Sequence, residues 1–204
     1  MSLARLLQLA SPALPVGAYS YSQGLEAAVE AGIVHDAASA GRWIGDVLEL
    51  SIARLDAPLL WRMLQGEDLN ELVLATRETA ELRAECVQMG FSLARLLPEF
   101  GLSDPGVEEP SFQHVFAGVA REWKLDARQV LIAYLWSWLE NQVMAAIKAV
   151  PLGQSAGQRM LLALGERLER IAGEAQSADW SNLAPGLAML STRHETQYSR
   201  LFRS

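Results

Sequence analysis

One stretch of the sequence, residues 126–150, constrains the fold more than any other. It opens with Asp126 and Gln129, a spacing that resembles a helix-capping box. Apolar residues then fall on nearly every side of a helix: Val130, Leu131, Ile132, Ala133, Tyr134, Leu135, Trp136, Trp138, Leu139, Val143, Met144 and Ile147. A helix that is apolar all round is buried. We therefore predict that this helix is the central element and that other helices pack around it.

The rest of the chain also has a helical pattern, because apolar residues recur every three or four positions and strand-like alternation is almost absent. We predict helices over 36–66 (kinked or restarted at Pro58, with Asp56 as a cap), 68–97, 111–123, 155–172 and 187–201, with loops over 99–110 and 173–185. The predicted fold class is all-α: a single-domain helical bundle of roughly seven to nine helices, typical of packed helical folds. Within the domain, 1–204, we expect an N-terminal arm over 1–20 and a C-terminal tail over 187–204.

The charge and cysteine content exclude several classes of function. A formal net charge of -7 argues against non-specific binding to nucleic acid or to an anionic membrane, since both need a basic face. The single cysteine, Cys86, excludes an intrachain disulfide and a four-thiolate zinc site. The longest apolar run, 130–136, is far shorter than the about 18 residues of a membrane span. Gln8 and Pro12 interrupt the N-terminal apolar stretch, which is too short for a signal peptide. We expect a cytoplasmic protein with neither a nucleic-acid nor a membrane partner.

The sequence also lacks the usual catalytic motifs. Gly153 and Gly157 are four residues apart and no lysine follows them, so no phosphate-binding loop is present. His194 and Glu195 resemble the start of a zinc-protease motif, but Tyr198 stands where the second histidine is needed. We predict that the chain is not an enzyme and has no catalytic residues, metal site or cofactor. The alternative is a small helical metal-dependent hydrolase that uses His194 and Glu195.

Three stretches contain residues that packing alone does not require. The first, the N-terminal motif, covers 9–26 and includes Tyr19, Ser20 and Glu26. Its two prolines favour an extended backbone, and the hydroxyls of Ser20 and Ser22 can cap the helix that follows. Composition alone predicts a stiff arm laid over the bundle.

The second stretch lies at the end of the central helix and contains Lys148, Pro151, Gln154 and Gln158. A lysine at a helix C-terminus complements the helix dipole. Lys148 is therefore either a simple dipole partner or a charge presented to another protein.

The third stretch is the end of the chain, which interleaves aromatic, aliphatic and charged residues. Its candidate partner-binding residues are Arg193, His194, Glu195, Tyr198, Arg200, Leu201, Phe202 and Arg203. Aromatic residues and arginine are enriched at the energetic centres of protein interfaces. We expect a tail that becomes ordered on a partner or a helix docked within the molecule.

Together the three stretches resemble the UreF family of urease accessory proteins. The resemblance lies in LASP at 9–12 with PVGAYSYSQGLE at 15–26, in KAVPLGQ at 148–154 with GQR at 157–159, and in RHE at 193–195 with YSRLFRS at 198–204. The matches occur in family order from the first turn to the last residue, so the resemblance covers the whole chain. The region 36–123 contributes only a helical pattern.

The resemblance implies a non-catalytic, all-helical dimer that takes part in nickel insertion into urease. Members of this family bridge UreD (also called UreH), which contacts apo-urease, and the GTPase UreG, whose activity they modulate. On this basis residues 193–203 would contact UreD/UreH, and Lys148, Pro151 and Gln154 would belong to the dimer or UreG-facing surface. Tyr19, Ser20, Glu26 and Gln158 are further candidates for partner binding. No nucleotide or metal site is implied, because the GTP chemistry belongs to UreG.

Overall fold

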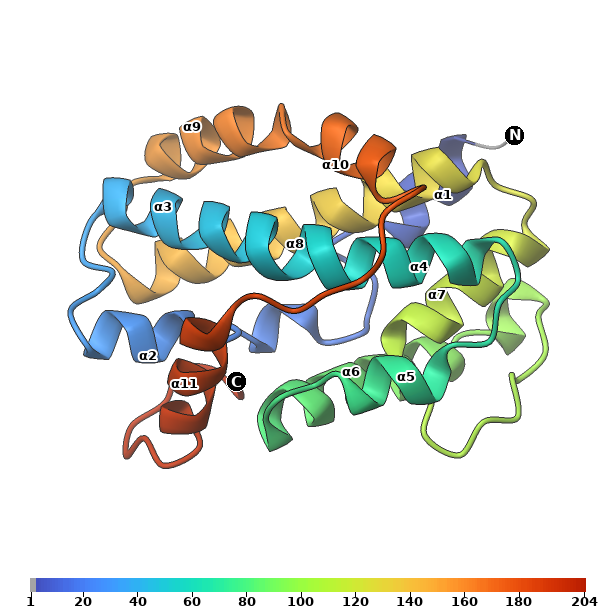
Figure 1. Cartoon of the computed structure of the whole chain (residues 1–204), viewed down its shortest axis with the longest axis horizontal. Coiled ribbons are helices and arrows are strands. Elements are labelled where there is room, and N and C mark those ends of the chain that lie inside the picture. The colour runs from blue at the N-terminus through green and yellow to red at the C-terminus, as the bar shows by residue number, and fades with distance from the viewer. Residues whose placement is uncertain (1–2) are drawn as a thin grey trace.

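The computed structural model describes residues 3–204, and in these residues the chain forms helices and no strands (Figure 1). The predicted all-α fold class is confirmed. The α-helices are α1 (Leu3–Leu9), α2 (Leu25–Glu30), α3 (Ala37–Val47), α4 (Ala57–Leu64), α5 (Asn70–Ala75), α6 (Ala80–Ala94), α7 (Phe112–Glu122), α8 (Ala127–Ala149), α9 (Gln154–Gly165), α10 (Leu168–Glu174) and α11 (Pro185–His194). Three further helical segments are η1 (Ala18–Ser20), η2 (Leu48–Asp56) and η3 (Pro98–Phe100).

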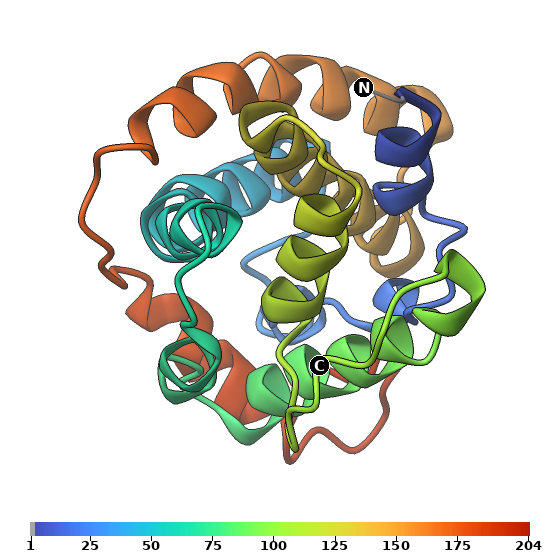
Figure 2. The same ribbon diagram turned by 90° about the vertical axis from the view of Figure 1, so that its right-hand side faces the viewer.

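Helix α8 is the central element, as predicted. The carboxylate of Asp126 accepts a hydrogen bond from the backbone N–H of Gln129 and so caps the helix. Its residues Val130, Leu131 and Leu135 are fully buried, and α1, α2, α3, α4, α9 and α10 all pack on it. Figure 2, turned by 90°, shows the other helices arranged around this centre. By length and composition α8 could also cross a membrane. However, half of its most apolar 18-residue stretch is buried inside the bundle, as expected for a core helix.

The predicted helix over 36–66 is one continuous helical rod made of α3, η2 and α4. It begins with a capping box between Asp36 and Ser39. The middle part, η2, is a π-helix, in which the hydrogen bonds span five residues. The return to α-helical spacing falls at Pro58, which has no N–H to donate. The prediction that Asp56 caps a new helix is wrong, because its side chain caps nothing and is bound elsewhere.

Two of the predicted long helices are each broken in two. The helix over 68–97 divides into α5 and α6 because the hydroxyl of Thr79 accepts a hydrogen bond from Leu82 N–H and starts a new helix. The helix over 155–172 divides into α9 and α10 just after Gly165, which lies close against the ring of Trp136. Helices α9 and α10 both pack on α8, so the break between them lets this part of the chain follow the surface of the core.

Within the N-terminal arm over 1–20, residues 3–9 form α1, which buries Leu9. Met1 and Ser2 lie outside the described residues. The last helix does not continue to Leu201; it ends at His194. Residues 195–204, hereafter the terminal segment, leave the helix because other parts of the chain bind their backbone.

Candidate functional site

The terminal segment folds back onto the N-terminal motif. The N–H of Arg203 donates to the carbonyl of Ser20 (2.7 Å), and the N–H of Ser22 donates to the carbonyl of Ser204 (2.7 Å). The carboxylate of Glu26 accepts hydrogen bonds from the N–H groups of Leu201 (2.7 Å) and Phe202 (3.0 Å). These pairs join the two ends of the described chain, with about 175 residues between them. The chain end lies beside α11 in Figure 1.

A buried histidine ties the terminal segment to two helices. His194 has no solvent exposure, and its Nε2 atom lies 3.1 Å from Glu26 Oε2 while its Nδ1 atom lies 2.7 Å from Glu81 Oε2. Arg200 donates to the second oxygen of Glu81 at 2.7 Å. The carboxylates of Glu26 and Glu81 thus alternate with the imidazole of His194 and the guanidinium of Arg200.

A third glutamate, Glu85 of α6, lies under the last residue. Its carboxylate accepts hydrogen bonds from Ser204 Oγ (2.9 Å) and from Gln23 Nε2 (2.8 Å), and Gln23 in turn accepts from Trp138 Nε1 (2.7 Å). Burial raises the pKa of Glu85 to about 7, although these hydrogen bonds act in the opposite direction. Glu85 therefore changes charge near neutral pH.

Lys148 completes the cluster from the end of α8. Its Nζ atom lies 5.7 Å from the ring centre of Phe202 and 5.8 Å from that of Tyr19. These distances are within the range of cation–π attraction. Phe202 is buried, whereas Tyr19 is two-thirds exposed. Lys148 thus contacts both the terminal segment and the N-terminal motif.

The opposite face of the terminal segment is open to solvent. Tyr198 is fully exposed and Leu201 is 71% exposed. Arg193, Arg200 and Arg203 are also exposed. We call these five residues the tail surface. Its mixture of an aromatic ring, an aliphatic side chain and guanidinium groups is the composition typical of protein-interaction surfaces.

The structure brings most of the predicted site residues together, but not all. One cluster contains Tyr19, Ser20, Glu26, Lys148 and those candidates between His194 and Arg203 that hold the terminal segment in place. Pro151, Gln154 and Gln158 lie apart from it, exposed at the turn between α8 and α9. Asn141 of α8 also binds the N-terminal motif, because its amide donates to the Tyr21 carbonyl (3.3 Å).

The geometry gives the metal-dependent alternative no support. Both ring nitrogens of His194 are occupied by carboxylates, and the Glu195 carboxylate accepts a hydrogen bond from the N–H of Ala80 at the start of α6. Across residues 3–204, no group of three or more histidine, cysteine or acidic side chains is arranged to hold a metal ion.

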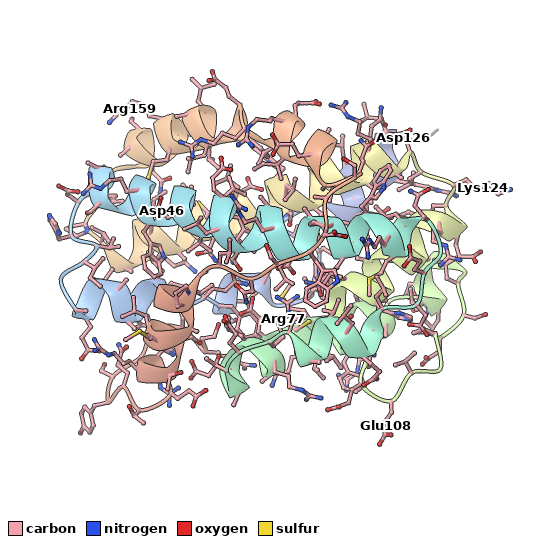
Figure 3. All side chains as sticks on the ribbon, viewed as in Figure 1. Asp46, Arg77, Glu108, Lys124, Asp126 and Arg159 are labelled. Carbon is pink, nitrogen blue, oxygen red and sulfur yellow. The ribbon has the colours of Figure 1, made fainter. Side chains whose placement is uncertain are left out.

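Sequence reasoning missed a second buried polar cluster. Arg77 forms a two-pronged ion pair with Asp56 (2.7 and 3.3 Å), and Gln113 donates to the same carboxylate (2.6 Å) and to the Tyr134 hydroxyl (2.9 Å). Cys86 donates to Gln113 Oε1. Figure 3 labels Arg77 near the middle of the molecule. A signal existed in the sequence: an acidic residue, Asp56, lies among apolar residues, with Leu55 before it and 57–60 after it.

The second cluster is structural in its chemistry. Burial opposes the charge of Arg77, yet the facing Asp56 raises the pKa of Arg77 still further above its usual range. Burial raises the pKa of the Cys86 thiol and that of the Tyr134 hydroxyl, so both stay protonated. A cavity separates this cluster from Gln23 and Glu85 of the first one.

Comparisons with known proteins agree with the sequence pattern. A family model described as UreF matches residues 34–165. A protein from Azoarcus sp. (strain BH72) named urease accessory protein UreF is 57% identical, over 100% of this chain and 96% of its own length. Proteins of the same name from Dechloromonas aromatica (strain RCB) and Janthinobacterium sp. (strain Marseille) are 50% and 47% identical, each over 100% of this chain and 98% of their own length.

Proposed function

The chain belongs to the UreF family of urease accessory proteins, and from this membership we propose that it acts in nickel insertion into urease as a non-catalytic scaffold. In this role it bridges UreD/UreH, bound to apo-urease, and the GTPase UreG, and it modulates the GTPase activity. Nickel is the cargo of the complex and not a resident cofactor of this chain.

The observation that carries the proposal is the tail surface. Hydrogen bonds to Glu26, Ser20 and Ser22 fix the backbone of the terminal segment, so the exposed side chains of Tyr198, Leu201 and the three arginines are presented from an ordered backbone. Ordering before binding lowers the entropic cost of association. We propose that UreD/UreH binds this surface.

Point variants test this proposal better than a deletion. Phe202 and Ser204 are buried, so removing the end of the chain would also expose part of the core. The variant Tyr198→Ala/Leu201→Ala changes only exposed side chains. We expect it to weaken UreD/UreH binding by at least tenfold, since hot-spot truncations cost about 2 kcal/mol or more each. Isothermal calorimetry with purified UreD/UreH measures the affinity.

Leu162→Ala is the matched control. Leu162 lies on α9 and is exposed to the same extent as Leu201, 71%. The control should bind UreD/UreH like the unmodified chain. Unchanged binding by Tyr198→Ala/Leu201→Ala, or an equal loss in Leu162→Ala, would contradict the assignment of the tail surface.

We further propose that Gln154 and Gln158, together with Pro151 and Lys148, belong to the surface that meets UreG. Gln154 and Gln158 are four residues apart on α9, which puts both exposed side chains on one face of the helix. Gln154→Ala/Gln158→Ala should lower UreG capture in a pull-down and leave UreD/UreH capture unchanged. Loss of UreD/UreH capture instead would contradict the division of the two surfaces.

The homodimer and the cytoplasmic location remain predictions from the family resemblance and the composition. Sedimentation equilibrium of the purified chain tests the first, because a dimer has twice the chain mass of 22.3 kDa. Fractionation of cells that express the chain tests the second.

A further inference from the structure

The region around the tail surface has positive charges without an anionic partner in the structure. Arg193 and Arg203 are exposed, and so is Lys148, which lies against two aromatic rings beside the terminal segment. Within residues 3–204, none of these three side chains forms an ion pair with a carboxylate. Arg203 donates instead to a neutral group, Gln88 Oε1 (3.3 Å). These charges are available to an anionic group of another molecule.

The carboxylates in this part of the molecule are bound by the chain itself. Glu26 and Glu85 are buried, and each accepts hydrogen bonds from the terminal segment. The side chain of Glu81 is only 12% exposed and is bound by Arg200, while Glu195 accepts from a backbone N–H of α6. The terminal region is thus layered: most of its negative groups lie inside, and its positive groups face the solvent.

Aromatic and aliphatic side chains alternate with the cations along the sequence. Tyr198 precedes Arg200, and Leu201 follows it before Arg203; both Tyr198 and Leu201 are exposed. In protein interfaces, central aromatic and apolar side chains contribute most of the binding energy, whereas charges at the rim mainly change the association rate. The tail surface therefore fits a partner face on which carboxylates surround an apolar recess.

A compact acidic protein face fits better than an anionic membrane. Basic clusters that hold proteins at membranes have about four to eight residues, each contributing about 1 kcal/mol. This region is at the lower limit, even when Lys148 and the paired Arg200 are counted with Arg193 and Arg203. The whole chain carries a formal net charge of -7, which repels an extended anionic surface. A compact face approaches the tail surface alone, because charges farther away than about 8 Å are screened at physiological salt.

We propose that the tail surface steers an acidic face of UreD/UreH into place: its arginines raise the rate of association, and Tyr198 and Leu201 then hold the complex. This inference rests on the proposed function, since it gives the chemistry of the partner assigned there. Complementary charges raise association rate constants by about 10- to 1,000-fold, and the gain falls steeply with ionic strength.

The salt dependence of binding tests the inference with the unmodified chain. Surface plasmon resonance with purified UreD/UreH measures the association and dissociation rate constants separately. We expect the association rate constant to fall at least about tenfold between about 20 mM and about 500 mM NaCl, because the screening length shortens several-fold over this range. A smaller fall overturns the proposal.

Charge reversal with a matched control tests the position of the charges. Arg193→Glu/Arg203→Glu should lower the association rate constant at low salt by at least about tenfold. The control is Arg42→Glu/Arg159→Glu, which changes the net charge equally at two exposed arginines of α3 and α9. Figure 3 labels Arg159 on α9, which lies across the bundle from α11 in Figure 1. The control should lose less than about threefold, and an equal loss overturns the proposal.

Amide exchange of Leu201 and Phe202, which both donate to Glu26, shows whether the terminal segment stays docked in the variant. If Arg203→Glu releases the segment, Arg193→Glu replaces the double variant and should still lower the association rate constant, by at least about threefold. An unchanged rate constant in Arg193→Glu then overturns the proposal.

The outcomes separate this inference from the proposed function. Binding to UreD/UreH that does not depend on salt overturns the steering surface and leaves the proposed function in place. Absence of binding at every salt concentration overturns the assigned partner and the inference with it. Vesicles that contain phosphatidylserine should not retain the chain at low salt. Retention that Arg193→Glu/Arg203→Glu abolishes would assign the surface to a membrane and overturn the proposal.

Discussion

Replacing Glu26 by alanine should release the terminal segment and destabilise the bundle. The Glu26 carboxylate makes three hydrogen bonds: it accepts from the N–H groups of Leu201 and Phe202, and it pairs with His194 Nε2 at 3.1 Å. Hydrogen bonds to a charged group contribute about 1.5 to 3 kcal/mol each. The three do not simply add, because the two N–H groups regain water once the segment has left the surface.

We take the cost from the groups that change their surroundings instead. Release of the segment takes Phe202 out of the core, which costs about 1.5 to 3 kcal/mol, and the buried His194 Nε2 loses its partner, which costs about 1 to 3 kcal/mol. For a chain of 150–250 residues each kcal/mol lowers Tm by roughly 2 to 4 °C. Glu26→Ala should therefore unfold at least about 5 °C earlier. Glu26→Gln keeps one acceptor oxygen, so its Tm should lie between that of Glu26→Ala and that of the unmodified chain.

Thermal unfolding followed by circular dichroism, together with trypsin digestion, measures the two effects. Trypsin should cut faster after Arg200 and Arg203 in Glu26→Ala, because the backbone there is no longer bound. Glu30→Ala is the control, since Glu30 is exposed on the same helix. A Glu26→Ala protein that melts within about 2 °C of the unmodified chain, a difference of less than about 1 kcal/mol, with its terminal segment still protected would refute this reasoning.

Three further substitutions have definite expected outcomes. Gly90→Ala should destabilise the chain by more than about 2 kcal/mol in urea unfolding, because the new Cβ would lie 1.9 Å from the Pro110 carbonyl oxygen, whereas Gly118→Ala, in open space, should be neutral or stabilising. The stability of Glu85→Gln relative to the unmodified chain should rise by roughly 2 to 3 kcal/mol from pH 5 to pH 8 in urea unfolding. Because the pKa of Glu85 is raised in the folded chain, the unmodified chain loses stability as pH rises through about 7. Asp56→Ala leaves the Arg77 guanidinium, on a side chain only 13% exposed, without its carboxylate and should cost about 3 kcal/mol in the same assay. An unfolding midpoint that stays unchanged in any of Gly90→Ala, Glu85→Gln at pH 8 or Asp56→Ala would contradict the argument for that substitution.

The fold class and the central helix could be predicted from the sequence because both depend on local apolar periodicity. The helix over 126–150 is apolar on nearly every side, so it must be buried whatever the arrangement of the neighbouring helices. Helix ends were harder to predict. Thr79 starts α6 through its own hydroxyl, but threonine also occurs inside helices, and no signal within 68–97 favours one reading over the other.

The end of α11 could not be predicted, because its cause is distant in sequence. Residues 195–201 keep a helical pattern of apolar spacing, yet a helix would have left Glu26 without the N–H groups of Leu201 and Phe202. Those partners are about 175 residues apart in sequence. Periodicity describes neighbours on one element and contains no information about such a pair. The sequence showed only that the two motifs contain side chains of opposite charge: a glutamate in the N-terminal motif and several arginines near the end of the chain.

The buried cluster also explains why three separated stretches have unusual residues. Glu26 and His194 belong to different stretches and are both buried, where such side chains are tolerated only with partners. Lys148, from the remaining stretch, is exposed and lies against the rings of Tyr19 and Phe202. The cluster holds the backbone from which Tyr198 and Leu201 point outward. If the proposed function holds, a variant inside the cluster lowers partner binding indirectly, by releasing the terminal segment. Only variants of the exposed face report on recognition itself, provided that hydrogen exchange shows the segment still docked.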